Sequence, residues 1–277
     1  MKGNVFVRIL QEAKQTGTAC AAINVLNYTT ARAVICAAQR AKRPVILQPS
    51  SGTVRRYGIA ETFRMLDGLR RGKETSVAIH LDHCTDVELA TGCIDAGWDS
   101  VMMDFSARSL EENIALTRQA VDYAHRKGVA VEGEVGVIAG VEDEIAHETA
   151  NPASYQETLA FLQAARVDAI APAIGTAHGV YQGRPQLNFQ LVEQQETAVV
   201  IHGGTGLPPQ DFQRLIRLGA AKINISTALK QVYMQSSRQA IEIEGITPIA
   251  YDKQVEEACS AAMEQYIRLF AGEEVVL

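Results

Sequence analysis

The chain has 277 residues, 47% of them hydrophobic, which is enough to bury a large core in one α/β domain. A formal net charge of -6, without any block of like charges, argues against nucleic acid or an anionic membrane as a partner. The first residues lack an apolar core behind a basic start, and no uninterrupted run of about 18 apolar residues follows. We therefore expect no signal peptide and no membrane span, and a cytoplasmic protein that acts on a small molecule.

Short runs rich in Val, Ile and Ala alternate along the chain with longer segments of helical periodicity. In residues 109–127, for example, Leu110, Ile114 and Val121 are spaced to share one helix face. This alternation is typical of buried parallel strands that are each followed by a crossover helix. It predicts a (β/α)8 TIM barrel, and because no Pro/Ser-rich linker interrupts the chain, residues 1–277 are predicted to form a single domain. The eight predicted strands are 19–25, 44–48, 76–82, 99–104, 129–134, 168–173, 198–203 and 221–226.

The longest stretch without clear periodicity, residues 136–155, follows the fifth predicted strand. It is rich in glycine and acidic residues, among them Glu142, and a solvated acidic excursion is the plain alternative to a functional loop. Loops that follow barrel strands build the active sites of this fold, and long loops in compact domains are usually functional. We therefore predict that this segment is a mobile catalytic loop.

Histidines follow three of the predicted strands. His83 comes after the third strand, His178 after the sixth, and His202 ends the seventh. Side chains at the carboxyl ends of barrel strands converge on one site. Three imidazoles can hold Zn²⁺ at about 2.0–2.1 Å and leave a coordination position open, as catalytic sites do. We predict a three-histidine metal site, and expect His80, on the opposite face of a regular strand, to have a supporting role.

Glycines and small polar residues cluster after the sixth, seventh and eighth predicted strands. Glycine lets backbone N–H groups approach an anion closely, as phosphate binding requires. Many barrels bind phosphate in the loops after strands seven and eight. Ordinary turn glycines are the plain alternative, but their position favours a phosphorylated ligand. The predicted cradle comprises Gly179, Gly203, Gly204, Thr205, Gly206, Asn224, Ser226 and Thr227.

The five cysteines are odd in number and show no Cys-X-X-Cys spacing, which argues against a disulfide framework or a cysteine zinc knuckle. We expect all five to be reduced and mostly buried, because free cysteine behaves as a small hydrophobic residue.

Several motifs in a fixed order, covering nearly the whole chain, resemble the class II, zinc-dependent ketose-bisphosphate aldolases, which include fructose- and tagatose-bisphosphate aldolases. The most specific stretches are HLDHC, SVMMDFS, EENIALT, VEGEVG, GVEDE, AIGTAHGVY, HGGTG and KINIST. The resemblance implies a lyase that reversibly cleaves a ketose 1-phosphate or 1,6-bisphosphate to dihydroxyacetone phosphate and an aldehyde, through a zinc-stabilised enediolate. It also implies a homodimer or homotetramer.

Site residues follow from the same resemblance. His83, His178 and His202 would bind one Zn²⁺ per subunit, with Glu134 as an additional or alternative ligand. Asp82 would transfer the proton at the C4 oxygen. On the loop, Glu142 would exchange the proton at C3. Asn24 and Ser50 would face the rest of the sugar, the cradle would hold the phosphate, and a monovalent cation (Na⁺ or K⁺) would assist there.

The chain departs from the family pattern at the second phosphate site. Thr247, Pro248 and Ile249 stand where many members have Asp-Pro-Arg, and Gln182 replaces a common lysine. Ser226 replaces an aspartate that some members carry. Loss of a guanidinium removes a bidentate phosphate contact. We hypothesise a substrate with one phosphate or an otherwise modified one, although Arg184 or Lys253 could compensate for the missing arginine.

Two other functions remain open from the sequence. A metal-dependent sugar-phosphate epimerase or isomerase would use the same enediolate but release no triose. A non-catalytic aldolase-like subunit would be expected to have lost metal ligands or proton-transfer groups, and this chain keeps both.

Overall fold

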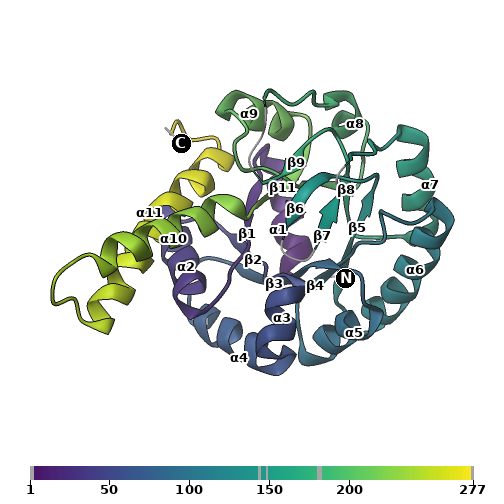
Figure 1. Cartoon of the computed structure of the whole chain (residues 1–277). Coiled ribbons are helices and arrows are strands. Elements are labelled where there is room, and N and C mark those ends of the chain that lie inside the picture. The colour runs from purple at the N-terminus through teal and green to yellow at the C-terminus, as the bar shows by residue number, and fades with distance from the viewer. Residues whose placement is uncertain (1–2, 143–144, 148, 180–182, 276–277) are drawn as a thin grey trace.

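In the part of the chain that the structure describes, eight parallel strands close into a barrel (Figure 1). The structure is a computed structural model and describes residues 3–142, 145–147, 149–179 and 183–275. Neighbours around the barrel follow the order β1-β11-β10-β8-β5-β4-β3-β2. Each predicted run overlaps one of these strands, so the predicted TIM barrel is confirmed. The strands are β1 (Cys20–Ile23), β2 (Val45–Leu47), β3 (Val77–Cys84), β4 (Ser100–Met103), β5 (Ala130–Val135), β8 (Ala169–Pro172), β10 (Ala198–Ile201) and β11 (Ala220–Ile225).

Helices cover the outside of the barrel, and most of them begin at side-chain caps (Figure 1). A reciprocal capping box of Asn27 and Thr30 begins α2, and one of Ser154 and Glu157 begins α7. These caps satisfy N–H groups that have no partner inside the helix. The helices of the outer layer are α2 (Tyr28–Ala41), α3 (Ser51–Tyr57), α4 (Ile59–Arg70), α5 (Val87–Ala96), α6 (Leu110–Arg126), α7 (Tyr155–Ala165), α8 (Phe189–Glu193), α9 (Pro209–Arg217), α10 (Thr227–Ile241) and α11 (Pro248–Phe270).

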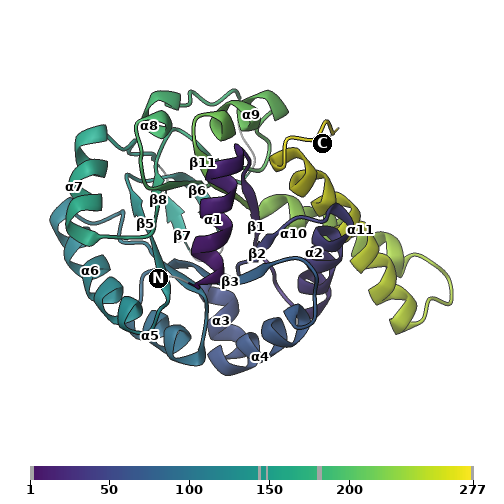
Figure 2. The same ribbon diagram turned by 180° about the vertical axis from the view of Figure 1, so that it is seen from behind.

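The helix α1 (Val5–Thr16) lies across one end of the barrel (Figure 2). Its residues Phe6, Ile9 and Leu10 are almost fully buried and pack inside the barrel. The strands meet them mostly with small side chains, which leaves room for the helix. This apolar filling closes the amino-terminal end of the barrel, so polar side chains can gather at the opposite end. The strand alanines in this inner core are Ala22, Ala78, Ala130, Ala169, Ala171 and Ala221.

Residues 136–155 are more ordered in secondary structure than we predicted. The strands β6 (Ala139–Glu142) and β7 (Ile145–His147) form an antiparallel hairpin, and β6 also pairs in parallel with β9 (Ala177–His178). The segment therefore contains short strands that its lack of periodicity did not reveal, and its role as a mobile catalytic loop stays a prediction. The strands are only two to four residues long and Gly140 interrupts the side-chain pattern, so periodicity could not reveal them.

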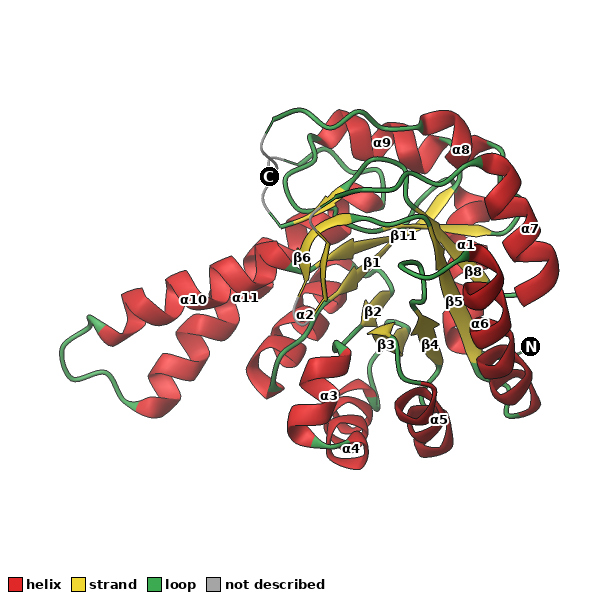
Figure 3. Cartoon of the chain, turned by 45° about the vertical axis from the view of Figure 1, so that its right-hand side comes forward, coloured by secondary structure: helices red, strands yellow, loops and turns green. Residues whose placement is uncertain are grey.

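The helices α10 and α11 form an arm that projects from the barrel (Figure 3). Three large apolar side chains are exposed at its outer end: Ile241, Ile243 and Ile249, the last with an exposed fraction of 79%. The departure from the family pattern at Thr247, Pro248 and Ile249 lies at this outer end, where α11 begins. These residues are therefore separated from the mouth of their own barrel.

The five cysteines are all unpaired, and four of them, Cys20, Cys84, Cys93 and Cys259, are buried. Burial raises the pKa of each of these four thiols, that of Cys259 to about 11. The predicted reduced and mostly buried state therefore agrees with the structure. Among the described helices, none is long and apolar enough to cross a membrane.

Candidate active site

Three histidines meet at the carboxyl end of the barrel. His83 lies near the end of β3, His178 in β9, and His202 directly after β10. The Nε2 of His83 is 2.8 Å from the Nδ1 of His202. The rings of His83 and His178 have centroids 5.1 Å apart. One nitrogen from each residue lies within 4.8 Å of the other two, and all three side chains are buried. The structure thus brings the three predicted ligands together.

The backbone at His83 leaves the regular strand conformation. Its φ is 44°, in the left-handed region that few non-glycine residues adopt, and the pairing of β3 with β4 shifts register there. Neighbouring residues of a regular strand point to opposite faces. The irregularity lets both Asp82 and His83 reach the barrel mouth. The premise that His80 faces away from the site is wrong, because its side chain lies inside the barrel 3.6 Å from the Oε2 of Glu132, while its supporting role stays a prediction.

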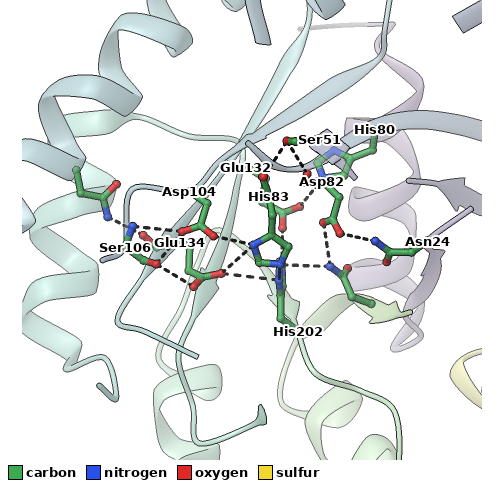
Figure 4. A network of polar contacts seen from close by, with 12 residues as sticks. Asn24, Ser51, His80, Asp82, His83, Asp104, Ser106, Glu132, Glu134 and His202 are labelled. Atoms are coloured by element: carbon green, nitrogen blue, oxygen red, sulfur yellow. Dashed lines mark hydrogen bonds and ion pairs between the residues drawn. The ribbon is translucent and has the colours of Figure 1, made fainter. Parts of the chain in front are cut away.

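Acidic side chains surround His83 (Figure 4). Its Nδ1 donates a hydrogen bond to the Oδ2 of Asp104 at 2.7 Å. The hydroxyl of Ser106 is 2.7 Å from the other oxygen of Asp104 and 3.1 Å from the Oε1 of Glu134. The remaining Glu134 oxygen, Oε2, is buried and has no hydrogen-bond partner in the described part of the chain. This oxygen is 3.8 Å from the Nδ1 of His202, so it is placed to serve as a further ligand.

The surroundings of His83 and His202 shift the pKa values of the two imidazoles in opposite directions. Burial opposes a charged imidazole, but the carboxylates of Asp82 and Asp104 outweigh it and raise the pKa of His83 well above its usual value. Burial lowers the pKa of His202. Burial, and next the charge of Asp104, raise the pKa of Glu134 well above its usual value.

The carboxylate of Asp82 is fully buried and oriented by amides (Figure 4). The Nδ2 of Asn24 donates to its Oδ2 at 2.7 Å, and the Nδ2 of Asn224 donates to its Oδ1 at 3.3 Å. The Nε2 of Gln48 in turn donates to the Oδ1 of Asn24 at 2.7 Å. Side chains at the ends of β1, β2 and β11 therefore fix the orientation of the carboxylate at the end of β3. The amide of Asn24, which was predicted to face the sugar, is hydrogen-bonded to Asp82. The hydroxyl of Ser50, predicted to do the same, caps the amino terminus of α3.

A pocket beside the histidines is lined by every residue of the predicted phosphate cradle except Gly206. The amino terminus of α10 opens onto it, and such helix ends attract anions because their N–H groups lack intrahelical partners. The Oγ of Ser226 and the Oδ1 of Asn224 are buried without hydrogen-bond partners among the described residues. Both therefore retain unused capacity toward a ligand. The lining residues are His178, Gly179, Gly203, Gly204, Thr205, Asn224, Ser226 and Thr227.

Two glycines hold the backbone of His178 in place. Gly140 pairs with His178 between β6 and β9, and a Cβ atom at Gly140 would overlap the His178 carbonyl oxygen. A Cβ atom at Gly203 would overlap the carbonyl oxygen of Ala177. Both glycines also have positive φ, 111° and 68° respectively. Close backbone contact on both sides of β9 therefore requires residues without side chains.

We predict that Gly140→Ala shifts His178 and weakens the metal site. Backbone overlap and strain at positive φ should destabilise the hairpin by about 1–3 kcal/mol. Metal titration of the purified variant, together with its melting temperature, measures both effects. The matched control is Gly68→Ala in α4, where a Cβ atom would meet open space. This control should be neutral or stabilising by up to about 1 kcal/mol. Equal metal affinity of the two variants would contradict the prediction.

The family model for class II fructose-bisphosphate aldolase matches residues 4–274. The chain belongs to this aldolase family. A fructose-bisphosphate aldolase of Staphylococcus aureus (strain Mu50) is 39% identical over 226 residues, which cover 79% of each chain. The fructose-bisphosphate aldolase of Geobacillus stearothermophilus is 38% identical over 240 residues, 84% of each chain. The crystal structure of the YdjI aldolase from Escherichia coli K12 superposes with a TM-score of 0.85 at 29% identity, covering 97% of each chain.

Family membership makes this protein an aldehyde-lyase that catalyses reversible aldol cleavage. Its donor set suits the metal ion that class II aldolases generally use. A tetrahedral ion about 2.0–2.1 Å from each nitrogen needs the nitrogens about 3.3 Å apart. His83 and His202 are 2.8 Å apart and would have to separate by only about half an ångström. The unpartnered oxygen of Glu134 adds a donor, so the residues of the aldolase fit a divalent ion.

Several residues around this site did not enter the predicted set. Asp104 and Glu132 lie in strand-end motifs that carried the resemblance, but neither was given a role. The signal that could have found Asp104 is an acidic residue at the end of an otherwise apolar barrel strand. Glu132, Gln48 and Lys222 carried no such signal, because a single polar residue in an apolar run does not reveal its partner on a distant strand.

Two predicted roles fall at the edge of the described chain. Glu142 lies at the end of β6, whose pairing with β9 connects it to the His178 segment, but its side chain is outside what the structure describes. Gln182 lies outside the described residues. The proton-exchange role of Glu142 therefore stays a prediction.

Proposed function

We propose that this aldolase cleaves a phosphorylated ketose to dihydroxyacetone phosphate and an aldehyde, with one Zn²⁺ held by His83, His178 and His202. The observation that carries the proposal is the common location of three groups: the histidines, the Asp82 carboxylate and the glycine-rich pocket. Asn224 connects them, since it lines the pocket and donates to Asp82. A substrate whose phosphate occupies the pocket would place its reacting carbons between the imidazoles and Asp82.

The donor set supports zinc and a second ligand position. Three imidazole nitrogens with one carboxylate oxygen form a combination that Zn²⁺ favours. Glu134 would act as the additional or alternative ligand, because its Oε2 is buried, without a hydrogen-bond partner among the described residues, and 3.8 Å from His202. When bound, the ion supplies Lewis-acid stabilisation of the negative charge that develops on the ketose oxygens. Asp104 and Glu132 orient His83 and His202 by accepting their other ring N–H groups.

Asp82 would act as the base at the C4 hydroxyl group. In the cleavage direction its carboxylate accepts the hydroxyl proton as the C3–C4 bond breaks and the aldehyde carbonyl forms. Hydrogen bonds from Asn24 and Asn224 hold the carboxylate in one orientation, which lowers the entropic cost of reaching the reactive geometry. In the reverse direction the same group returns the proton to the new C4 oxygen.

Glu142 would exchange the proton at C3 of the dihydroxyacetone phosphate half. Its place at the end of β6 supports this role, because β6 pairs directly with the segment that carries His178. The backbone at Gly179, Gly203, Gly204 and Thr205, with the side chains of Asn224, Ser226 and Thr227, would hold the phosphate. A monovalent cation, Na⁺ or K⁺, would bind beside that phosphate.

The substrate is proposed to be a ketose 1-phosphate or a similarly modified ketose, not fructose 1,6-bisphosphate. The residues that replace the family's Asp-Pro-Arg provide no cation, and Ile249 is exposed at the outer end of the projecting arm. The exposed apolar side chains of this arm also support contact between copies in a homodimer or homotetramer. A cytoplasmic location completes the proposal.

The deciding experiment is triose phosphate release from a panel of ketose 1-phosphates and 1,6-bisphosphates, with and without a chelator. We expect chelator-sensitive release of dihydroxyacetone phosphate, and a higher kcat/KM for the monophosphates. A clear preference for bisphosphates would contradict the substrate proposal alone. Epimerised or isomerised sugar without triose would favour the isomerase, and no turnover of any member would favour the non-catalytic subunit.

A further inference from the structure

A chain of buried polar groups runs from His202 toward the closed end of the barrel. The Nε2 of His202 donates to the Oε1 of Glu132 at 2.8 Å. The other oxygen of Glu132, Oε2, is 2.9 Å from the ammonium nitrogen of Lys222 and 3.6 Å from the Nε2 of His80. The ring of His80 stacks on Phe6 of α1, with centroids 5.2 Å apart and planes within 7°. All five side chains are essentially inaccessible to solvent.

The ion pair of Glu132 and Lys222 is not explained by stability. Both side chains have no exposed surface, and apart from His80 and His202 they lie in a barrel interior whose apolar core consists mainly of alanines and the apolar face of α1. Removing two charges from water costs about as much as their attraction returns, so well-packed apolar residues often serve a core equally well or better. An ion pair at this position therefore indicates a role other than stability, one that apolar side chains cannot fill.

This role concerns the orientation of the His202 ring, that is, which of its two nitrogens faces the proposed metal position. An imidazole has two nitrogens, and the hydrogen bond made by one decides which of them is left to bind a metal. Glu132 accepts from Nε2, which leaves Nδ1 directed toward His83. Lys222 contacts the Glu132 oxygen that His202 does not use. The carboxylate is thereby held with Oε1 toward His202.

We propose that Glu132, held by Lys222, is a positioning residue that fixes His202 with its Nδ1 toward the metal ion. The inference rests on the proposed function, because it assumes an ion at the three histidines. It assigns Lys222, on the opposite side of Glu132 from the site, an effect on metal binding without any contact with metal or substrate. At the end of these polar groups that lies farthest from His202, the ring of Phe6 stacks on His80 and packs against it.

The test is titration of metal-stripped protein with Zn²⁺, in competition with a chromophoric chelator, and with Co²⁺, followed by its visible d–d absorption. In Glu132→Gln the amide N–H₂ group must face either Lys222 or the Nε2–H of His202, so donor meets donor in both orientations. Lys222→Met leaves the buried Glu132 charge without its partner. We expect each single variant to bind Zn²⁺ about 10–100-fold more weakly and to show an altered Co²⁺ spectrum.

The double variant Glu132→Gln/Lys222→Met separates positioning from charge. The carbonyl of the introduced glutamine can accept from His202 while its amide faces the His80 side, so we expect Zn²⁺ affinity within roughly threefold of the parent and a restored Co²⁺ spectrum. A double variant as weak as the single ones would overturn the proposal, because the charge pair itself would then be what matters.

A matched control is Arg70→Met, which removes the pairing of Arg70 with Asp99 at the start of β4. It should lower thermal stability but leave metal affinity unchanged. Single variants that melt earlier yet bind both metals like the parent would overturn the positioning role and leave the metal site intact. If the parent chain binds Zn²⁺ no better than His202→Ala, the proposed metal site fails, and the inference fails with it.

Discussion

Asp82→Asn is expected to lower kcat for aldol cleavage by about 10²–10⁴-fold, the usual contribution of a positioned general base. An amide of the same shape cannot accept the C4 hydroxyl proton, while the donors Asn24 and Asn224 remain next to it. Because Asp82 is not one of the proposed ligands, Zn²⁺ affinity should change far less than kcat. A coupled assay of dihydroxyacetone phosphate release measures the rate, and chelator competition measures the metal.

The matched control for this substitution is Asp99→Asn. Asp99 is also a mostly buried carboxylate on a barrel strand, but it lies at the opposite end, where it accepts the backbone N–H of Ile79 at 2.7 Å. Its amide variant should be less stable and retain kcat within about twofold, because no reacting group lies near it. An Asp82→Asn variant that keeps more than a tenth of the parent kcat would contradict the assignment of Asp82 as the base.

Removal of the metal is expected to abolish cleavage and to destabilise the fold. A ligand that binds only the folded state stabilises it by about 2.7 kcal/mol when its concentration is 100 times its Kd. The melting temperature should therefore fall on chelation and recover with added Zn²⁺. Affinity should also fall as the pH is lowered, since the raised pKa of His83 means that a proton competes with the ion for its Nε2.

His202→Ala should reproduce the chelated state at any Zn²⁺ concentration that saturates the parent. The control is His125→Ala, because His125 lies on the outer surface, where its Nε2 pairs with Asp168. That variant should bind metal and cleave substrate normally. Calorimetric titration at several pH values reports both affinity and proton release. Full activity in the presence of a strong chelator would exclude a metal-dependent mechanism.

The barrel strands were predictable because each is buried on both faces and therefore reads as a continuous apolar run. Strand-end polar residues were predictable as a group for a related reason, since the carboxyl ends of barrel strands converge on one site, whereas the buried His80, Glu132 and Lys222 inside the barrel carried no such signal. The hairpin of β6 and β7 escaped prediction because its strands are short and β6 also pairs with β9, thirty or more residues further along the chain.

The sequence by itself determined the fold class and predicted which histidines and glycines meet at the barrel mouth, because each depends on local patterns: apolar runs, helical spacing, and histidines with glycines at strand ends. Only the tertiary structure decided how these residues act on one another. One such feature is the positive φ of His83, which brings its side chain to the barrel mouth. The others are contacts between strands that are distant in sequence: the two amides on Asp82, and the chain from Lys222 through Glu132 to His202. The physical reason is that a hydrogen bond or ion pair depends on distance and angle between two side chains, which residue identities alone do not specify.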